Sequence, residues 1–372
     1  MGLLGLGSDN TPAGTNPISN MATKLPPVRL SLAQVTDLAE RCLSLHGLAP
    51  SLKAAVVKDL TDNERDGCSS HGLHRLPGFV AALLHKKVSP VDEPVVRVDQ
   101  ARVYVDAKGG FAPPCAAVGV PALAEAAKKF GIAAMCVQNQ CHFGPLHHEV
   151  ETLAAEHGCV ALSFVNSKAY CAPAGGTGKR LLGSNPIAFA FPREGGIPPF
   201  VFDQATAASS RGEIELKRLD GHELPPGCAL TVDGKPTVDP TEALAGAQCA
   251  MGGVKGSALL IAVELLAACL SDSMLAHEAV ADDPSWRGPS KGGQTIIAIR
   301  AGDAAAARAT ELMTVIEADV KAGGGRLPHA RRLQARATTH ETGVEIRGAL
   351  HAELLAILDG QAPTTQTYAV KK

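Results

Sequence analysis

The chain has 372 residues, enough for two or three packed lobes around a deeply buried site. Its 35 basic and 37 acidic side chains nearly cancel, and aromatic residues make up 3% of the chain, which argues against a nucleic-acid partner. The ten cysteines include no CxxC pair and stand mostly in apolar runs, as reduced, buried thiols of a cytoplasmic protein do. These features favour a small-molecule partner.

Residues 1–26 are rich in Gly, Asn, Pro and Ser, and their first basic residue is Lys24. This composition fits neither a signal peptide nor a transit peptide, so we predict a flexible leader. The longest apolar stretch, residues 257–270, is interrupted by Glu264 and falls short of the roughly 20 residues that span a bilayer. It predicts a buried core helix, and no membrane partner is expected.

Two helices are predicted near the N-terminus. Ser31 and Gln34 have the spacing of a capping box, which indicates a helix over residues 31–49. A second helix starting at Ser51 delivers the segment SSHGLHRLP, residues 69–77, at its end. That segment is therefore expected in a loop or at an element boundary, where chemistry is common.

The middle of the chain alternates between helix and strand patterns. Residues 119–131 predict a helix with Pro121 near its start, and residues 132–138 predict a fully buried strand that leads to His142. After another helix, strands are expected over residues 159–167, 187–192 and 200–206. Helices over residues 303–321 and about 341–358 end the pattern. The fold class is mixed α and β.

The segment at 69–77 combines a hydroxyl, an imidazole and a guanidinium. His71 suits general acid or base catalysis, Ser70 stands beside it, and Arg75 can grip a small carboxylate. Asp203 is the best partner for His71, because it closes an apolar strand where an unpaired carboxylate is costly. Structural interpretations stay open: Asp203 can cap a turn, His71 can bond a backbone carbonyl, and Arg75 can form a salt bridge.

His142 stands at a strand end in the motif CHFG, where a glycine permits close backbone approach. It can serve as a second acid, a carbonyl polariser or a cofactor contact, although a lone histidine is more often structural. Neighbouring cysteines and histidines, His147 and His148 among them, suggest zinc. However, Glu151 or Thr152 stands where a zincin helix needs histidine, so we expect no metal.

Glycine-rich segments do not match the known nucleotide-binding loops. GGTGKR, residues 175–180, has Pro173 where a Walker A loop needs glycine and Arg180 where it needs Ser or Thr, although its amides can still contact an anion. A GxGxxG fingerprint follows no predicted strand, which disfavours a Rossmann domain.

Six motifs occur together in an order that resembles the malate/L-lactate dehydrogenase-like family of NAD(P)-dependent oxidoreductases, which lies outside the Rossmann group. They are SHGLHRLPG at 70–78, CHFG at 141–144, GSNPIAFAFP at 183–192, FDQATA at 202–207, LPPG with GKPTVDP at 224–240, and GGVKG at 252–256. Within the family, the segments GGFAPP, HFGPLHHEVE and VALSFVNS are similar to Δ1-piperideine-2-carboxylate/Δ1-pyrroline-2-carboxylate reductases.

The resemblance implies a mixed α+β, non-Rossmann NAD(P)-binding fold with a largely antiparallel sheet. It implies an N-terminal helical domain over 27–105, joined by C-terminal helices within about 303–372, and NAD(P)-binding and central sheet domains over 106–302. It also implies a homodimer with its active site between domains.

The resemblance also assigns roles to residues. It implies a relay of Ser70, His71 and Asp203 with His71 as the proton donor, and it makes Arg75 and His142 the substrate-binding residues. The implied cofactor-binding residues share motifs that line a groove: His142, Phe143, Gly144, Pro145, Leu146, Asn185, Pro186, Thr206, Lys255 and Gly256.

The implied reaction carries hydride from NADPH, with NADH as the other candidate, to C2 of a cyclic imine carboxylate, giving L-pipecolate or L-proline. The alternative on the same fold is reduction of a 2-oxo acid to a 2-hydroxy acid of the malate or lactate type. Lys179, Arg180 and Arg211 are the candidate partners for the 2′-phosphate of NADPH. Ser184 and Ala207 depart from the usual threonine and serine of the family, which leaves cofactor selectivity open.

Overall fold

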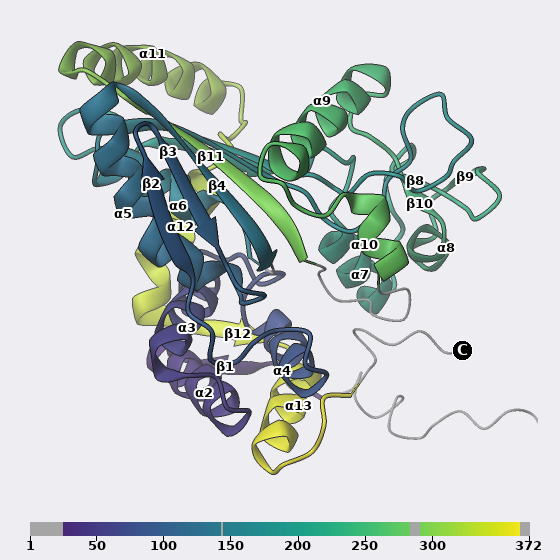
Figure 1. The fold of residues 1–372 in the computed structure, drawn as a ribbon. Coiled ribbons are helices and arrows are strands. Elements are labelled where there is room, and N and C mark those ends of the chain that lie inside the picture. The colour runs from purple at the N-terminus through teal and green to yellow at the C-terminus, as the bar shows by residue number, and fades with distance from the viewer. Residues whose placement is uncertain (1–24, 143, 283–290, 365–372) are drawn as a thin grey trace, which may run out of the picture.

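A mixed sheet forms the centre of the molecule, in a computed structural model that describes residues 25–142, 144–282 and 291–364 (Figure 1). Its strands lie in the order β2 (Val95–Asp99), β3 (Arg102–Asp106), β4 (Ile132–Cys141), β11 (Lys291–Arg300), β5 (Cys159–Val165), β6 (Ile187–Phe191) and β7 (Phe200–Gln204). In this sheet β3 and β4 pair in parallel, and the other neighbouring pairs are antiparallel. The predicted mixed fold with a largely antiparallel sheet is confirmed. Most of the predicted leader, residues 1–24, lies outside the described part.

Different helices cover the two faces of the sheet, because side chains alternate along each strand. On one face, α5 (Ala112–Phe130) and α6 (His147–Ala155) pack against strand residues such as Ala161 and Ile296. On the other face, α9 (Val254–Glu264) continues into a π-helical turn, Leu265–Cys269, that packs against Phe164 and Ile297. One face of the sheet is therefore fully covered by helices, and the other face is only partly covered.

Both ends of the chain build a helical lobe beside the sheet (Figure 1). Its helices are α2 (Leu32–Leu45), α3 (Pro50–Arg65), α4 (Leu76–Leu84) and α13 (Gly348–Leu358), which pack around β1 (Val28–Leu30) and its antiparallel partner β12 (Val344–Ile346). Ser31 and Gln34 form the predicted capping box of α2. α12 (Ala330–Thr342) lies against α3. α11 (Asp303–Ala322) instead lies at the opposite end of the sheet, where Glu317 pairs with Arg193.

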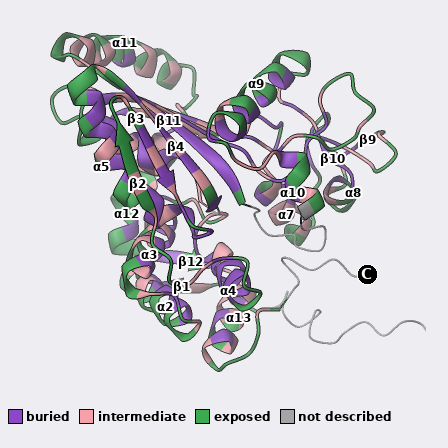
Figure 2. Ribbon diagram, viewed as in Figure 1, coloured by how far each residue is buried: buried purple, intermediate pink, exposed green. Residues whose placement is uncertain are grey.

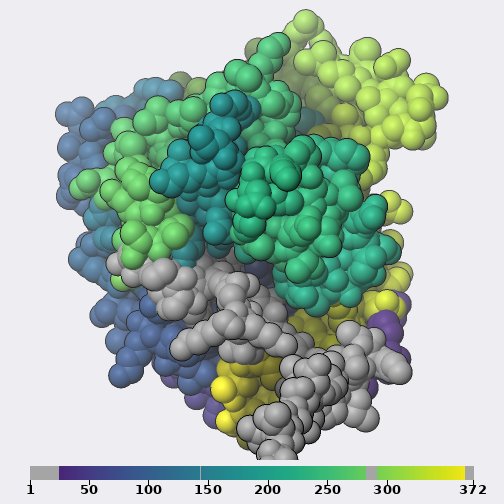
Figure 3. All heavy atoms as spheres, turned by 90° about the vertical axis from the view of Figure 1, so that its right-hand side faces the viewer, coloured from purple at the N-terminus to yellow at the C-terminus, as the bar shows by residue number. Residues whose placement is uncertain are grey.

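A third lobe of short elements follows β7 in the chain. Figure 3 shows the side of the molecule on which this lobe lies. It contains α7 (Arg211–Asp220), β8 (Ala229–Leu230), β9 (Pro236–Thr237), α8 (Pro240–Ala245) and β10 (Ala247–Gln248), with α10 (Ala276–Asp282) nearby. Its small core consists of Ile214, Leu224, Cys228, Ala229 and Ala243.

Two predicted helices have other bounds in the structure. α5 begins at Ala112, so Pro121 lies inside the helix and not near its start; the prolines directly after Ala112 provide the favoured first-turn signal instead. The predicted helix at about 341–358 is divided into the end of α12, strand β12 and α13. β12 has no local signal, because the strand that pairs with it stands at the other end of the chain.

Two burial predictions were wrong. The strand at 132–138 alternates between buried and partly exposed side chains, because only one of its faces is fully covered by helices. The core helix at 257–270 packs one side on the sheet and leaves the other in solvent, where Leu259 is 45% and Leu265 is 56% exposed (Figure 2). Among the described residues, no helix is both long and apolar enough to cross a bilayer.

Candidate active site

Glu64, near the end of α3, shapes the loop that carries the predicted catalytic segment. This glutamate is buried, and its Oε1 accepts a hydrogen bond of 2.7 Å from the backbone N–H of Leu73. A Cβ at Gly72 would lie 2.2 Å from the same oxygen, so glycine is required for this close approach. The buried carboxylate thereby holds the loop closed before a short 3-10 turn, Leu73–Arg75.

The loop brings Ser70, His71 and Arg75 together. Oγ of Ser70 lies 2.9 Å from Nδ1 of His71, and Nε of Arg75 donates a hydrogen bond of 2.7 Å to the carbonyl of Ser70. A Cβ at Gly212 would lie 2.7 Å from Nη2 of Arg75, so the guanidinium rests against the first turn of α7. Ser70 thus orients the imidazole through Nδ1, and Nε2 is the ring nitrogen that this contact does not use.

Burial and a neighbouring charge keep His71 neutral in the free protein. Burial is the largest cause that lowers the pKa of His71 to about 3, and the charge of Arg75 acts in the same direction. The carboxylate of Asp203 opposes both. A further negative charge nearby would favour the protonated form of His71.

Asp203 lies in β7 and binds the start of α6. Its Oδ2 accepts hydrogen bonds from the backbone N–H groups of Leu146 at 2.7 Å and His147 at 3.0 Å. Burial pushes the pKa of Asp203 up, but the hydrogen bond and charge of His147 outweigh burial and hold the pKa below its usual value. Among the described residues no hydrogen bond joins Asp203 to His71, so the carboxylate acts on His71 through its charge.

His147 belongs to this cluster, although the sequence suggested it only as a zinc ligand. Its side chain is 1% exposed, with Nδ1 at 3.5 Å from Oδ2 of Asp203 and Nε2 at 3.6 Å from Oδ2 of Asp66. Burial lowers its pKa, but the two carboxylates have the larger combined effect and raise it above the usual value. The one sequence signal was a histidine pair that stands six residues beyond the end of β4.

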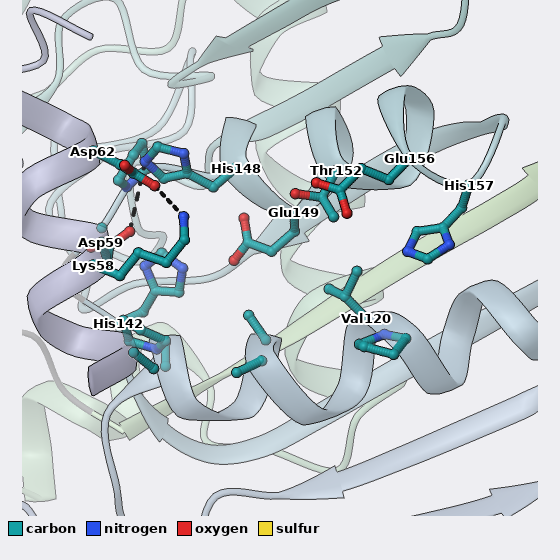
Figure 4. A pocket seen from close by; sticks show the side chains of 18 residues that line it. Lys58, Asp59, Asp62, Val120, His142, His148, Glu149, Thr152, Glu156 and His157 are labelled. Atoms are coloured by element: carbon teal, nitrogen blue, oxygen red, sulfur yellow. Dashed lines mark hydrogen bonds and ion pairs between the residues drawn. The ribbon is translucent and has the colours of Figure 1, made fainter. Parts of the chain in front are cut away.

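His142 lines a pocket of about 270 Å³ between α3, α5 and α6 (Figure 4). Burial lowers the pKa of this histidine to about 4, so its imidazole is neutral. Gly144 and Pro145 border the same pocket, and Leu146 is buried behind it. Phe143 lies outside the described residues.

The opposite wall of this pocket is polar. Asp59, His148 and Glu149 face the space beside His142, whereas alanines and prolines of α5 line the other side. Burial raises the pKa of Glu149 to about 8 and that of Asp59 to about 7. Both carboxyl groups are therefore substantially protonated at neutral pH, and the pocket is less acidic than its residues suggest.

The other predicted cofactor residues differ in what their side chains do. Asn185 is fully buried and its Nδ2 donates to Oε2 of Glu264 at 2.8 Å, while Oγ1 of the equally buried Thr206 donates to the carbonyl of Asn185 at 2.7 Å. A Cβ at Gly256 would lie 1.5 Å from a backbone oxygen, so this position also serves the backbone. Lys255 is exposed at the start of α9.

The candidate partners of a 2′-phosphate also differ in what their side chains do. Arg211 stacks over the ring of Tyr170 at 4.3 Å, and its Nη2 donates to a backbone carbonyl at 3.3 Å, so it is engaged within the protein. Lys179 and Arg180 are exposed. Pro186 precedes β6, and its carbonyl accepts a long bond of 3.4 Å from a neighbouring strand end.

Two features of the structure fit a nicotinamide dinucleotide. The pocket at His142 has an apolar wall of small side chains, as ring-binding pockets do. Gly252 and Gly253 have positive φ angles of 60° and 64°, and no atom lies within 4 Å of the Cβ that either residue lacks. This open turn leaves the first N–H groups of α9 and Lys255 accessible to an anion such as a pyrophosphate.

One cluster in the described part of the chain has donor atoms close enough for a metal. Asp66, His147 and His148 place ligand atoms within 4.8 Å of one another. However, Asp66 already pairs with Arg65 and Arg336, and two guanidinium groups disfavour a further cation beside it. The cluster fits a buried ion-pair network better than a metal centre.

The largely antiparallel sheet, together with the loop that carries His71 and Arg75, fits a class of nicotinamide oxidoreductases that lies outside the Rossmann group. The sequence model of the malate/L-lactate dehydrogenase family matches residues 30–355, and the chain belongs to that family. The resemblance drawn from the six motifs is confirmed.

Particular relatives are Δ1-pyrroline-2-carboxylate reductases. The chain is 43% identical to Δ1-pyrroline-2-carboxylate reductase of Ancylobacter novellus, covering 89% of this chain and 98% of the relative. It is also 43% identical to Δ1-pyrroline-2-carboxylate/Δ1-piperideine-2-carboxylate reductase of Pseudomonas aeruginosa, covering 89% of this chain and 100% of the relative. Among solved structures, Δ1-piperideine-2-carboxylate reductase of Pseudomonas syringae matches with a TM-score of 0.81 and 36% identity, covering 89% of this chain and 99% of that one.

Proposed function

We propose that the protein reduces the C=N bond of cyclic imine carboxylates, converting Δ1-pyrroline-2-carboxylate to L-proline and Δ1-piperideine-2-carboxylate to L-pipecolate. The observation that carries the proposal is the joint placement of a half-buried imidazole and a guanidinium, His71 and Arg75, on one loop of a chain so similar to imine reductases. The two residues match the two needs of the substrate, a proton for nitrogen and an anchor for the carboxylate.

Arg75 anchors the substrate. A guanidinium binds a carboxylate through two parallel N–H groups, and the bond from Nε of Arg75 to the carbonyl of Ser70 leaves the Nη groups for that purpose. The bound carboxylate also offsets the charge of Arg75 that lowers the pKa of His71. Substrate binding thereby favours protonation of His71 at the moment when a proton is needed.

His71 holds the proton for the imine nitrogen. A bound reduced nicotinamide supplies the hydride that C2 accepts. The C=N bond becomes a CH–NH bond when carbon gains that hydride and nitrogen gains the proton from Nε2 of His71. Ser70 fixes the imidazole through Nδ1, and Asp203 stabilises the charged form electrostatically.

We place the cofactor between the loop at 142–146 and the open turn before α9, with NADPH preferred. Lys255 and the exposed pair Lys179 and Arg180 are basic groups within this proposal that a phosphate can reach. In this proposal, the backbone around the cofactor site is held in place by Asn185, Pro186, Thr206 and Gly256.

We also propose a homodimer in the cytoplasm. Five large apolar side chains are exposed along α9 and the turn after it: Val254, Leu259, Ile261, Leu265 and Leu270. Monomeric proteins seldom leave such a stripe in water, and a second copy covers it in this proposal. Buried cysteines such as Cys42, Cys115 and Cys171 have free thiols, which suits a reducing compartment.

A substrate panel tests the function. The absorbance of NADPH and NADH is followed with Δ1-pyrroline-2-carboxylate, Δ1-piperideine-2-carboxylate, pyruvate and oxaloacetate. We expect oxidation of the cofactor with the two imines, and a loss of about 10²–10⁴-fold in His71→Ala of unaltered fold. Faster turnover of the oxo acids would support the 2-oxo acid alternative, and wild-type activity in His71→Ala would contradict the assigned donor.

A further inference from the structure

The carboxylate of Asp203 acts on two imidazoles, and only one of them belongs to the loop proposed to bind substrate. His71 feels the charge of this carboxylate from one side. His147 lies on the other side, with Nδ1 at 3.5 Å from Oδ2, and its own backbone N–H donates to the same oxygen. Asp203 is thus a single buried negative charge that either histidine can balance.

The far side of His147 is fixed by a second carboxylate. Asp66 is fully buried and accepts hydrogen bonds from Nε of Arg65 at 2.7 Å and Nε of Arg336 at 2.9 Å. Arg336 also binds Glu151 at 2.6 Å, which ties α12 to α6. These partners hold Asp66 ionised, so a protonated His147 lies between two negative groups.

The groups that face His147 come from several elements. The carboxylates are Asp203 on β7, Asp66 after α3 and, further away, Asp59 on α3; the opposing groups are Arg332 on α12, His71 on the loop and the neighbouring ring of His148. The two nearest groups are the carboxylates, which favour the charged imidazole.

We propose that His147 is a positioning residue that carries the resting positive charge beside Asp203 and thereby adds to the burial and the Arg75 charge that keep His71 neutral until substrate binds. Two imidazolium groups beside one carboxylate repel each other, so a proton on His147 disfavours a proton on His71. Once a substrate carboxylate offsets Arg75, His71 becomes able to hold a proton as well. The catalytic part of this inference rests on the proposed function, whereas the resting charge distribution does not.

The resting charge is tested by NMR titration of the imidazoles in the full chain without substrate. In His147→Gln we expect the pKa of His71 to rise by at least one unit, a tenfold gain in proton affinity. His147→Phe keeps a ring in the space and removes the charge, so it should give the same shift and covers the case in which the glutamine variant fails to fold. His74→Gln removes another imidazole from the loop without touching a carboxylate and should leave the pKa of His71 unchanged.

The kinetic arm measures kcat against pH with imine substrate. In His147→Gln, the part of the pH profile on which kcat falls with rising pH should move to higher pH by at least one unit, with KM nearly unchanged. A merely structural role of His147 would lower activity without moving this part of the profile. An unchanged or lowered pKa of His71 in both His147 variants would overturn the inference. Failure of the substrate panel alone would leave the NMR result intact and would contradict only the proposed function.

Discussion

Arg75 is the residue whose role separates binding from chemistry most clearly. Its Nε is held by the carbonyl of Ser70, so the side chain is oriented before a ligand arrives. We expect Arg75→Ala to raise KM for the imine by roughly 10- to 100-fold, the value of a charge-assisted bidentate pair, with a smaller effect on kcat. Arg75→Lys keeps the positive charge but loses the paired N–H groups of the guanidinium, so its KM should lie between those of the wild type and Arg75→Ala. Steady-state kinetics measures both constants, and an unchanged KM would contradict the clamp.

The buried carboxyl group of Glu149 should make the stability of the folded protein depend on pH. Burial raises the pKa of this carboxyl from 4.5 to about 8, so the folded protein keeps a proton that the unfolded chain releases. The contribution of Glu149 is present in full below about pH 4.5 and is lost as pH rises to about 8. Glu149→Gln should therefore flatten the decline in stability between neutral pH and about pH 8. Urea unfolding at several pH values checks this, and parallel curves for both proteins would count against it.

At the scale of elements, Glu264 joins three segments. The sequence presents it as an interruption of an apolar helix, but the structure shows it 7% exposed at the end of α9. Its Oε2 accepts from Nδ2 of Asn185 at 2.8 Å, and its Oε1 accepts from the backbone N–H of Ala276 at 2.7 Å and from Nδ2 of Asn166 at 3.4 Å. One carboxyl group therefore fixes the positions of α9, the start of α10 and both ends of the connection between β5 and β6.

Removing this carboxyl group should destabilise the fold. We expect Glu264→Ala to lower the free energy of unfolding by roughly 2–4 kcal/mol, because buried donors such as the N–H of Ala276 lose their partner. Glu264→Gln keeps an acceptor oxygen and should lose less. Urea unfolding followed by circular dichroism measures both, and a neutral alanine variant would show that water replaces the carboxyl group.

At the scale of the whole molecule, the outer side of α9 is apolar and exposed. We propose that a second copy of the chain covers it. Leu265→Glu places a charge in that contact and should weaken the dimer at least 100-fold, which light scattering during gel filtration would report as a monomer. Leu312→Glu is the matched control, since Leu312 is 60% exposed on the distant helix α11 and should leave the dimer intact. A wild-type protein that is monomeric at micromolar concentration would refute the proposal.

The arrangement of lobes explains which parts of the site are readable from sequence. The motif SHGLHR is local, so Ser70, His71 and Arg75 could be assigned together before any fold was known. His147, Asp66 and Arg336 come from α6, the end of α3 and α12, and no spacing in the chain connects them. Asn185 and Thr206 also belong to the family motifs, but their side chains turn out to bond within the protein.

By itself the sequence determined the mixed fold class, the family and the loop with its hydroxyl, imidazole and guanidinium, because capping signals, strand patterns and short motifs act over a few residues. Only the tertiary structure decided that β12 is a strand, that α9 has an exposed apolar side, and that Asp203 is shared with a second buried imidazole. Those features depend on pairing, burial and charge between distant segments. Such interactions exist only after the chain has folded.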